Sequence, residues 1–310
     1  MMRRAIAATV ALAAIAAVSS AATLPVSVQN PAGIPLEAEP VTTGVPFPES
    51  ALASAANVRL LDEAGEELPL QVTVTGSYPD GSVRWLLLDF QVDLPPDGCT
   101  LTLEFGEGVE RAATPPPPDL DLLGLERRLA PYFVDDAGVQ YRIDLDGTWE
   151  EELAGPIRSV ATARQWYAND AGDQKCQAII RVHSYRGKPW VRIFYTWIMT
   201  EDSRELRFSD IGLRIPMPVE RVVFGTGEGP VSHQAPAYLL QYDHDQSLIS
   251  AGGERADTGR ASGWMAVESG DAHAVLACRD LWQLFPKELE ATPEGLVFHT
   301  WPAHGIADSK

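Results

Sequence analysis

Residues 75–90 read TGSYPDGSVRWLLLDF, and this stretch decides the fold of the first part of the chain. Polar and apolar residues alternate up to Tyr78, and Pro79-Asp80-Gly81 supplies the residue types of a tight turn. Residues 83–90 then form a strongly apolar run. The pattern predicts a β-hairpin. We expect Trp85 and the three leucines after it to hold a small β-barrel together.

The amino terminus has the three parts of a secretory signal peptide. Residues 1–4 are basic, residues 5–18 are apolar apart from Thr9, and residues 19–22 are small. We therefore assign residues 1–22 to a signal peptide and expect a secreted or periplasmic protein. The apolar run is shorter than the roughly 20 residues of a spanning helix, and no later stretch approaches that length. We expect no membrane span.

The composition is strongly acidic. The formal net charge is −19, and it becomes −21 when Arg3 and Arg4 leave with the signal peptide. Because nucleic acids are polyanions, we expect no nucleic-acid partner. The same charge repels acidic glycans at long range, so such a ligand needs a local cluster of arginines.

Four consecutive prolines at residues 115–118 predict a stiff, extended linker between two domains. We place the linker at residues 113–118. Before it, over residues 23–112, short β-patterned runs separated by Gly, Pro and Asp predict a small barrel. After it, residues 119–310 contain longer and more numerous strand patterns, which predict a large antiparallel β-sandwich. Both parts are all-β.

A second hairpin, which turns at residues 186–189, carries the candidate substrate-binding residues. Pairing Tyr185 with Trp190 fixes which side chains share a face, because directly opposed residues point the same way. One face is apolar and belongs to a core. The other carries Arg181, His183, Tyr185, Trp190, Arg192 and Phe194.

That second face suits an acidic glycan. Aromatic rings stack on the apolar faces of sugars, and arginine pairs with a uronate carboxylate through two parallel hydrogen bonds. The alternative is a solvent-facing sheet with cross-strand cation–π pairs, or a surface that docks another domain.

Residues 233–245, HQAPAYLLQYDHD, contain the residue types of proton-transfer chemistry. Eliminative cleavage of a uronide needs a base for the C5 proton, a cation beside the carboxylate, and an acid for the departing oxygen. The candidates for proton transfer here are His233, Tyr238 and His244. Asp243 and Asp245 could help to hold calcium, although two carboxylates fall short of its usual six to eight oxygen ligands. The alternative is a polar, solvated loop.

Several stretches together resemble the exo-rhamnogalacturonan lyase family. They are TGVPFP at residues 43–48, VRLLDEAGEELPL at 58–70, the hairpin at 75–90, RDLWQLFPKEL at 279–289, and the pairs Gly295-Leu296 and Trp301-Pro302. The earlier stretches are similar to the family's amino-terminal RIFT-type barrel, and the later ones to the close of its central β-sandwich. In this family an α/α toroid follows and is expected to pack on the sandwich. The sequence stops at Lys310, where the toroid would begin.

The resemblance implies β-elimination of pectic rhamnogalacturonan, an acidic plant-type polysaccharide. It implies that residues 1–310 are the amino-terminal portion of such an enzyme, with little or no turnover of their own. Arg279, near the junction with the toroid, is the fourth catalytic candidate, although packing is the alternative for that segment. A non-catalytic carbohydrate-binding or accessory β-module is the alternative function.

Overall fold

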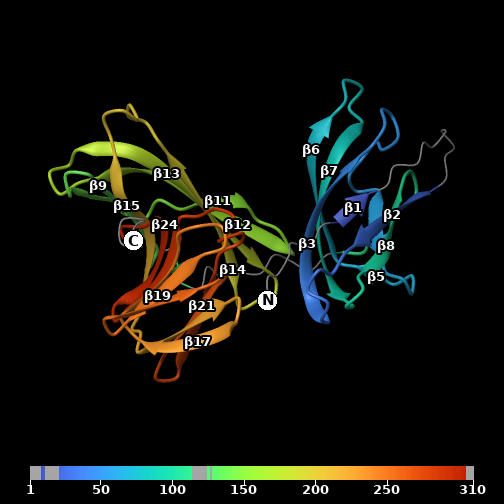
Figure 1. Ribbon diagram of the computed structural model, residues 1–310. Helices are drawn as coiled ribbons and strands as arrows, with labels where there is room; N and C mark the ends of the chain where they lie inside the picture. The colour runs from blue at the N-terminus through green and yellow to red at the C-terminus, as the bar shows by residue number, and fades with distance from the viewer. Residues whose placement is uncertain (1–7, 11–20, 114–123, 126–127, 305–310) are drawn as a thin grey trace.

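The structure, a computed structural model, describes residues 8–10, 21–113, 124–125 and 128–304. Within these residues the regular elements are all strands, as the sequence predicts. Figure 1 shows two bodies, one in blue and cyan and the other in green to red. The predicted signal peptide and proline linker fall almost wholly outside the described residues. Within the predicted signal peptide, Ala8–Val10 forms a short strand, β1, which pairs with β2.

Two sheets enclose the core of the first domain. Its remaining strands are β2 (Ala22–Val28), β3 (Leu36–Pro46), β4 (Val58–Leu61), β5 (Glu67–Leu68), β6 (Leu70–Ser77), β7 (Val83–Leu94) and β8 (Cys99–Phe105). The sheets have the orders β1-β2-β8-β4-β5 and β3-β7-β6. Apolar residues from both sheets, such as Leu60 and Leu103 of the first and Leu86 of the second, form one buried cluster. The predicted small barrel is therefore confirmed.

Strands β6 and β7 form the hairpin that the sequence predicts. Ser77 lies opposite Val83, and the Gly81 N–H donates to the Tyr78 carbonyl at 2.9 Å. Gly81 has a φ of +85°, a conformation that glycine adopts without a steric penalty.

The side chains of β7 alternate between the two faces of the sheet, and this corrects one expectation. Leu86, Leu88 and Phe90 are fully buried in the barrel core. Because successive residues of a strand point to opposite faces, Trp85 points outward. Trp85 is 42 % exposed, and its ring lies beside Gly44 and Gly76, where an added Cβ would come within 3.9 and 3.6 Å of it. Trp85 covers two glycines of neighbouring strands and does not fill the core.

The second domain contains a 12-stranded sheet and a four-stranded sheet. Strands of the large sheet are β9 (Ala130–Asp135), β10 (Gln140–Arg142), β11 (Glu150–Leu153), β12 (Arg158–Ala168), β13 (Gln174–Tyr185), β14 (Val191–Ile198), β15 (Phe208–Pro216), β18 (Ala237–Gln241), β19 (Ser247–Ala251), β20 (Glu254–Thr258), β23 (Lys287–Thr292) and β24 (Gly295–Trp301). Strands of the small sheet are β16 (Arg221–Thr226), β17 (Gly229–Gln234), β21 (Ala261–Ser269) and β22 (Ala272–Ala277). All pairings are antiparallel, which confirms the predicted antiparallel architecture.

The large sheet has the order β14-β13-β12-β10-β9-β15-β24-β23-β18-β19-β20, with β11 beside β12. Its first half curls on itself, because Phe133 of β9 lies 6.2 Å from Trp197 of β14 between ring centroids although three strands separate them. Its second half packs against the small sheet. There Leu239 and Leu289 share a core with Phe224 of β16.

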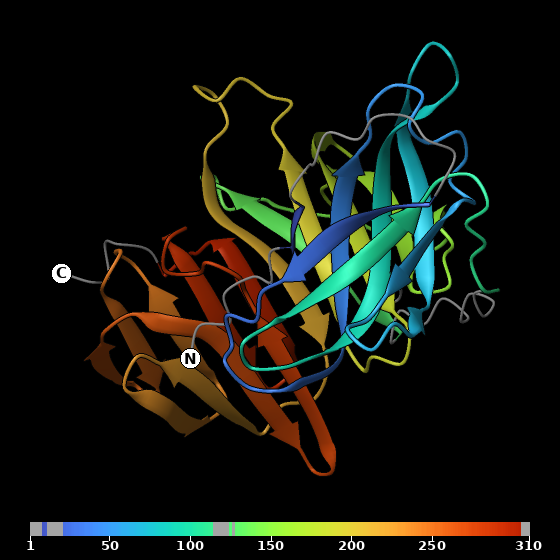
Figure 2. The same cartoon turned by 90° about the vertical axis from the view of Figure 1, so that its right-hand side faces the viewer.

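A buried ion pair joins the two domains. Arg158, at the start of β12, donates from Nε to Asp89 Oδ1 of β7 at 2.7 Å and from Nη2 to Asp89 Oδ2 at 3.1 Å. Gln71 of β6 accepts hydrogen bonds from the backbone N–H groups of Ile157 and Arg158 at 3.1 and 2.9 Å. Figure 2 shows the barrel in front of the green and yellow strands, with the orange and red strands extending to one side. The barrel therefore docks on the β12–β13 region of the sandwich.

None of the described residues belongs to a helix that is long and apolar enough to cross a membrane.

Candidate functional site

The β13–β14 hairpin has the register that the sequence predicts. His183 lies opposite Arg192, and Arg181 opposite Phe194. The rings of Tyr185 and Trp190 are 5.0 Å apart, and Arg192 lies 5.9 Å above the Tyr185 ring. The six residues that the sequence assigns to this face therefore lie on one face of the sheet.

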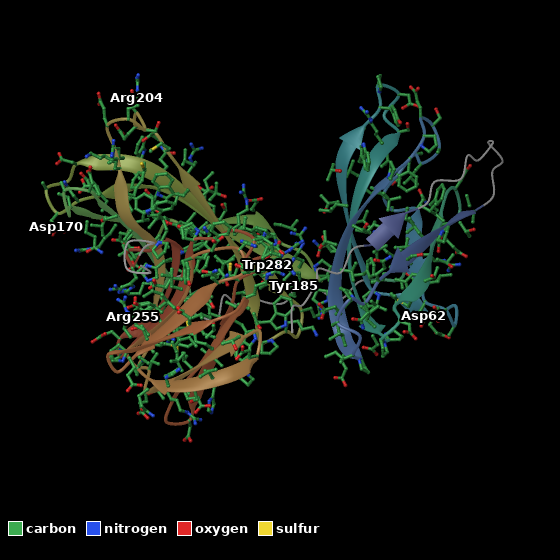
Figure 3. All side chains as sticks on the ribbon, in the orientation of Figure 1. Asp62, Asp170, Tyr185, Arg204, Arg255 and Trp282 are labelled. Carbon is green, nitrogen blue, oxygen red and sulfur yellow. The ribbon has the colours of Figure 1, made fainter. Side chains whose placement is uncertain are left out.

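These residues differ in their exposure to solvent. Arg192 is exposed and Phe194 is 47 % exposed, whereas Tyr185 is buried. The guanidinium of Arg181 is paired with Glu152 at 2.6 Å. Figure 3 places Tyr185 on the side of the sandwich that faces the barrel. Part of the face therefore packs near the domain junction, and the part around Arg192 and Phe194 is accessible.

His183 links this face to the junction between the domains. Its Nδ1 lies 3.2 Å from Nη1 of Arg158, the arginine that pairs with Asp89. Burial, and then the charges of Arg158 and Arg192, lower the pKa of His183 to about 4. His183 is therefore neutral at physiological pH and accepts a hydrogen bond from Arg158.

A second group of polar side chains lies on one face of five adjacent strands, and we name it the polar row. Its members are Tyr132 of β9, Asp210 of β15, His299 of β24, Glu288 and Glu290 of β23, and Tyr238 of β18. The Cα register places His299 opposite Gly212 on one side and opposite Glu288 on the other. Tyr238 lies opposite Glu290.

His299 is the centre of the polar row. Its Nδ1 lies 2.8 Å from Asp210 Oδ1, and its Nε2 lies 3.1 Å from Glu290 Oε2 and 3.5 Å from Glu288 Oε1. The hydroxyl of Tyr132 donates to Asp210 Oδ2 at 2.8 Å. Gly212 makes room for this hydroxyl, because a Cβ at that position would come within 2.6 Å of it.

The charges of the row compensate one another. Burial disfavours a charge on His299, but hydrogen bonds to Asp210 and Glu290 outweigh it and raise the pKa of His299 to about 10. Burial alone would raise the pKa of Glu290; the hydrogen bond from His299 reverses this and lowers it. His304 donates to Glu288 Oε1 at 2.9 Å, which raises the pKa of His304. Without a bound ion, the row is an array of paired carboxylates and imidazolium groups.

A concavity of about 510 Å³ opens beside the row, where the chain passes from the small sheet into the large one. Its lining includes His233 of β17, Tyr238, Glu290 and His304. The rings of Tyr238 and His304 are stacked, with their centroids 4.1 Å apart. The volume lies within the range of roughly 300–1,000 Å³ that is usual for small-ligand sites.

The structure brings together two of the four catalytic candidates, since His233 and Tyr238 line the same concavity. His244 lies in the exposed turn after β18, where its Nδ1 contacts Asp243 at 3.0 Å and its Nε2 lies 3.6 Å from Asp245. Arg279 is exposed and pairs with Asp280 at 3.1 Å. Neither His244 nor Arg279 lines the concavity. The predicted calcium ligands Asp243 and Asp245 flank His244 in this turn and do not line the concavity either.

The site residues predicted from the sequence do not include Tyr132, Asp210, Glu288, Glu290 or His299. Among the described residues, Glu288, Glu290 and His299 form the group whose ligand atoms converge closely enough to hold a metal ion. The alternation of Glu288 and Glu290 around Leu289 was a usable signal, because it places both carboxylates on one face of a strand. Nothing in the local pattern indicates that this face is buried.

Comparison with known families assigns the first domain. Residues 26–92 match the PcRGLX-like N-terminal RIFT barrel domain. The match begins within β2 and ends within β7, includes the hairpin at residues 75–90, and lies within the range predicted for the barrel. The search for curated relatives of the chain gave no significant match. The RIFT barrel is therefore assigned by both sequence and structure.

Proposed function

We propose that this chain is the barrel-and-sandwich part of a secreted polysaccharide lyase that acts on pectic rhamnogalacturonan. The observation that carries the proposal is the RIFT barrel of residues 26–92. It is the domain that opens the exo-rhamnogalacturonan lyases, which the sequence resembles. The barrel is firmly docked through the Arg158–Asp89 pair, which supports a role as a fixed part of a larger catalytic protein.

The concavity beside the polar row supplies proton carriers of the kind that β-elimination needs. In this proposal the stacked Tyr238 and His304 are the proton carriers. Arg255 of β20 lies opposite Ser250, which in turn lies opposite Tyr238, so all three share a face of the sheet. Arg255 does not line the concavity itself. In this assignment it neutralises the uronate carboxylate of a substrate that extends from the concavity along this face, since arginine binds a carboxylate through two parallel hydrogen bonds.

An assay for unsaturated uronate tests this assignment. The protein encoded by the whole gene is incubated with rhamnogalacturonan, and the ultraviolet absorbance of the unsaturated product is followed over a range of pH and calcium concentration. We expect turnover, and a rate about 10²-fold lower or more in Tyr238→Phe because general acid–base catalysis contributes at least that much. Tyr242→Phe, in the turn after the same strand, should leave the rate unchanged. Absence of unsaturated product under all conditions would rule out the lyase assignment.

A second candidate function is glycan binding without cleavage, and the β13–β14 face favours it. Arg192 and Phe194 are exposed side by side with Trp190 and Arg181, which presents cations and flat rings on one surface. Calorimetry with rhamnogalacturonan oligosaccharides tests this function. Losing two charge-assisted contacts in the Arg181→Ala/Arg192→Ala double variant should weaken binding about tenfold or more. Equal affinity of the variant and the natural protein would exclude this face.

A further inference from the structure

The side chains of Glu288, Glu290 and His299 have the spacing of metal ligands. Glu288 lies directly opposite His299 in the β23–β24 pair, and Glu290 follows on the same face. Ligand atoms of the three residues all lie within 4.8 Å of one another. Ligand atoms that share a tetrahedral zinc ion, with bonds of about 2.0–2.1 Å, are roughly 3.3 Å apart. The separations of His299 Nε2 from Glu290 Oε2 and Glu288 Oε1, 3.1 and 3.5 Å, bracket that value.

An independent observation points to a ligand for Glu288. Its side chain is 0 % exposed, and no group in the described part of the chain donates a hydrogen bond to its Oε2. A buried carboxylate oxygen without a partner is costly, because it has lost its hydration and gained nothing in return. A metal ion bound by the Glu288 carboxylate would give this buried group a further partner.

The Nδ1 side of the His299 ring, opposite Nε2, has the hydrogen-bond arrangement that usually orients a metal-binding histidine. Metal-binding histidines donate their second ring N–H to a carboxylate, which is itself held by hydrogen bonds. Here Asp210 faces Nδ1 at 2.8 Å, and Tyr132 donates to the other oxygen of Asp210. Since an ionised carboxylate can only accept, Nδ1 carries the proton. Loss of the Nε2 proton on metal binding then leaves a lone pair directed toward Glu288 and Glu290.

We propose that Glu288, Glu290 and His299 bind one divalent transition-metal ion, for which zinc is the best match, with Asp210 as the residue that positions His299. Mixed imidazole and carboxylate donors suit zinc, whereas calcium takes six to eight oxygen ligands. Glu290 belongs both to this donor set and to the lining of the concavity. The ion therefore binds at the border of the concavity. The inference goes beyond the proposed function, because it holds whichever glycan, if any, the concavity accepts.

Zinc titration of the protein tests the proposal. After removal of metal with a chelator, calorimetry with Zn²⁺ should show saturable binding of one equivalent, and excess Ca²⁺ should not compete. Glu290→Gln, which keeps the shape of the side chain, should weaken zinc binding by tenfold or more. Asp210→Asn should weaken it by about 10–100-fold, the usual effect of losing a partner of a metal-binding histidine. Glu294→Gln is the matched control, because Glu294 is an exposed acid in the β23–β24 turn, and it should leave binding unchanged.

Cobalt spectroscopy gives a second readout that does not depend on variants folding. Co²⁺ bound to the natural protein should give the visible absorption of four-coordinate cobalt, and Zn²⁺ should abolish it. Circular dichroism checks that each variant is folded. Failure of the natural protein to bind Zn²⁺ saturably would overturn the proposal, as would a folded Glu290→Gln variant with unchanged zinc affinity and an unchanged cobalt spectrum.

Discussion

His183 and His299 lie in the same 12-stranded sheet, and their neighbours carry opposite charges. His183 lies beside Arg158 and faces Arg192, and its pKa is lowered to about 4. His299 contacts three carboxylates, and its pKa is raised to about 10. The β13–β14 edge of the sheet thus concentrates positive charge in a strongly acidic protein, whereas the interior strands β24 and β23 concentrate negative charge. The first environment suits an anionic ligand, and the second suits a cation.

The largest expected effect is a loss of stability on replacing Arg158, which lies beside His183 in the positively charged region. Asp89 is 1 % exposed, so Arg158→Ala leaves a buried charge without its partner. We expect the free energy of unfolding to fall by about 3–5 kcal/mol in urea denaturation. Arg164→Ala is the control, because Arg164 is exposed on the same strand and donates to the side chain of Gln177. It should cost about 0.5 kcal/mol or less. Equal losses in both variants would show that the ion pair does not stabilise the docked domains.

A smaller loss of stability is expected when a methyl group fills the space beside Tyr132 in the polar row. In Gly212→Ala the new methyl group collides with the Tyr132 hydroxyl, which must leave Asp210. Overpacking of this kind costs about 1–3 kcal/mol. Thermal unfolding measures the loss, and NMR of the His299 ring should report its altered partner. Gly259→Ala is the control, since among the described residues no atom beyond its chain neighbours lies within 4 Å of the added methyl group. An unchanged His299 signal in Gly212→Ala would contradict the assigned link through Asp210.

The positive region could be predicted from the sequence because its geometry is local. A four-residue turn fixes the register of β13 and β14, and once Tyr185 is opposite Trp190, every side chain is assigned to a face. The hairpin at residues 75–90 was predictable for the same reason. Trp85 was expected to hold the barrel together with the leucines, but the alternation of β7 directs it outward.

The polar row could not be predicted because its strands are distant in the sequence. β9, β15, β24, β23 and β18 are neighbours in the sheet, yet they span residues 130 to 301 and follow no chain order. His233 and Tyr238 were found because they lie near each other in the chain. Asp210 and His299 meet only after β15 pairs with β24, and no local pattern predicts that pairing.

Truncating an exposed apolar side chain on the accessible part of the β13–β14 face should weaken glycan binding moderately. The same change at an exposed apolar residue elsewhere should not. Phe194 is 47 % exposed, and a sugar stacked on its ring would bury the remainder. Phe194→Ala should therefore weaken oligosaccharide binding by about 1 kcal/mol, or roughly fivefold. Val275→Ala is the control, because Val275 is 70 % exposed on β22 in the other sheet. Calorimetry measures both variants. Equal affinity of Phe194→Ala and the natural protein would show that ligand does not reach this ring.

The smallest effect should be a pH dependence that originates at His183. Its pKa in the folded protein, about 4, lies below the ordinary value of 6.5, so the unfolded chain binds more protons between these values. The His183 contribution to stability is therefore complete above pH 6.5 and is lost as the pH falls toward 4. Because the ring is partly exposed, solvent screening limits the loss to about 1 kcal/mol. In His183→Gln the amide oxygen still accepts a hydrogen bond from Arg158 but does not titrate. The difference in urea midpoint between neutral and acidic pH should therefore be smaller for His183→Gln than for the natural protein. An equal difference in the two proteins would show that the acid sensitivity originates at another residue.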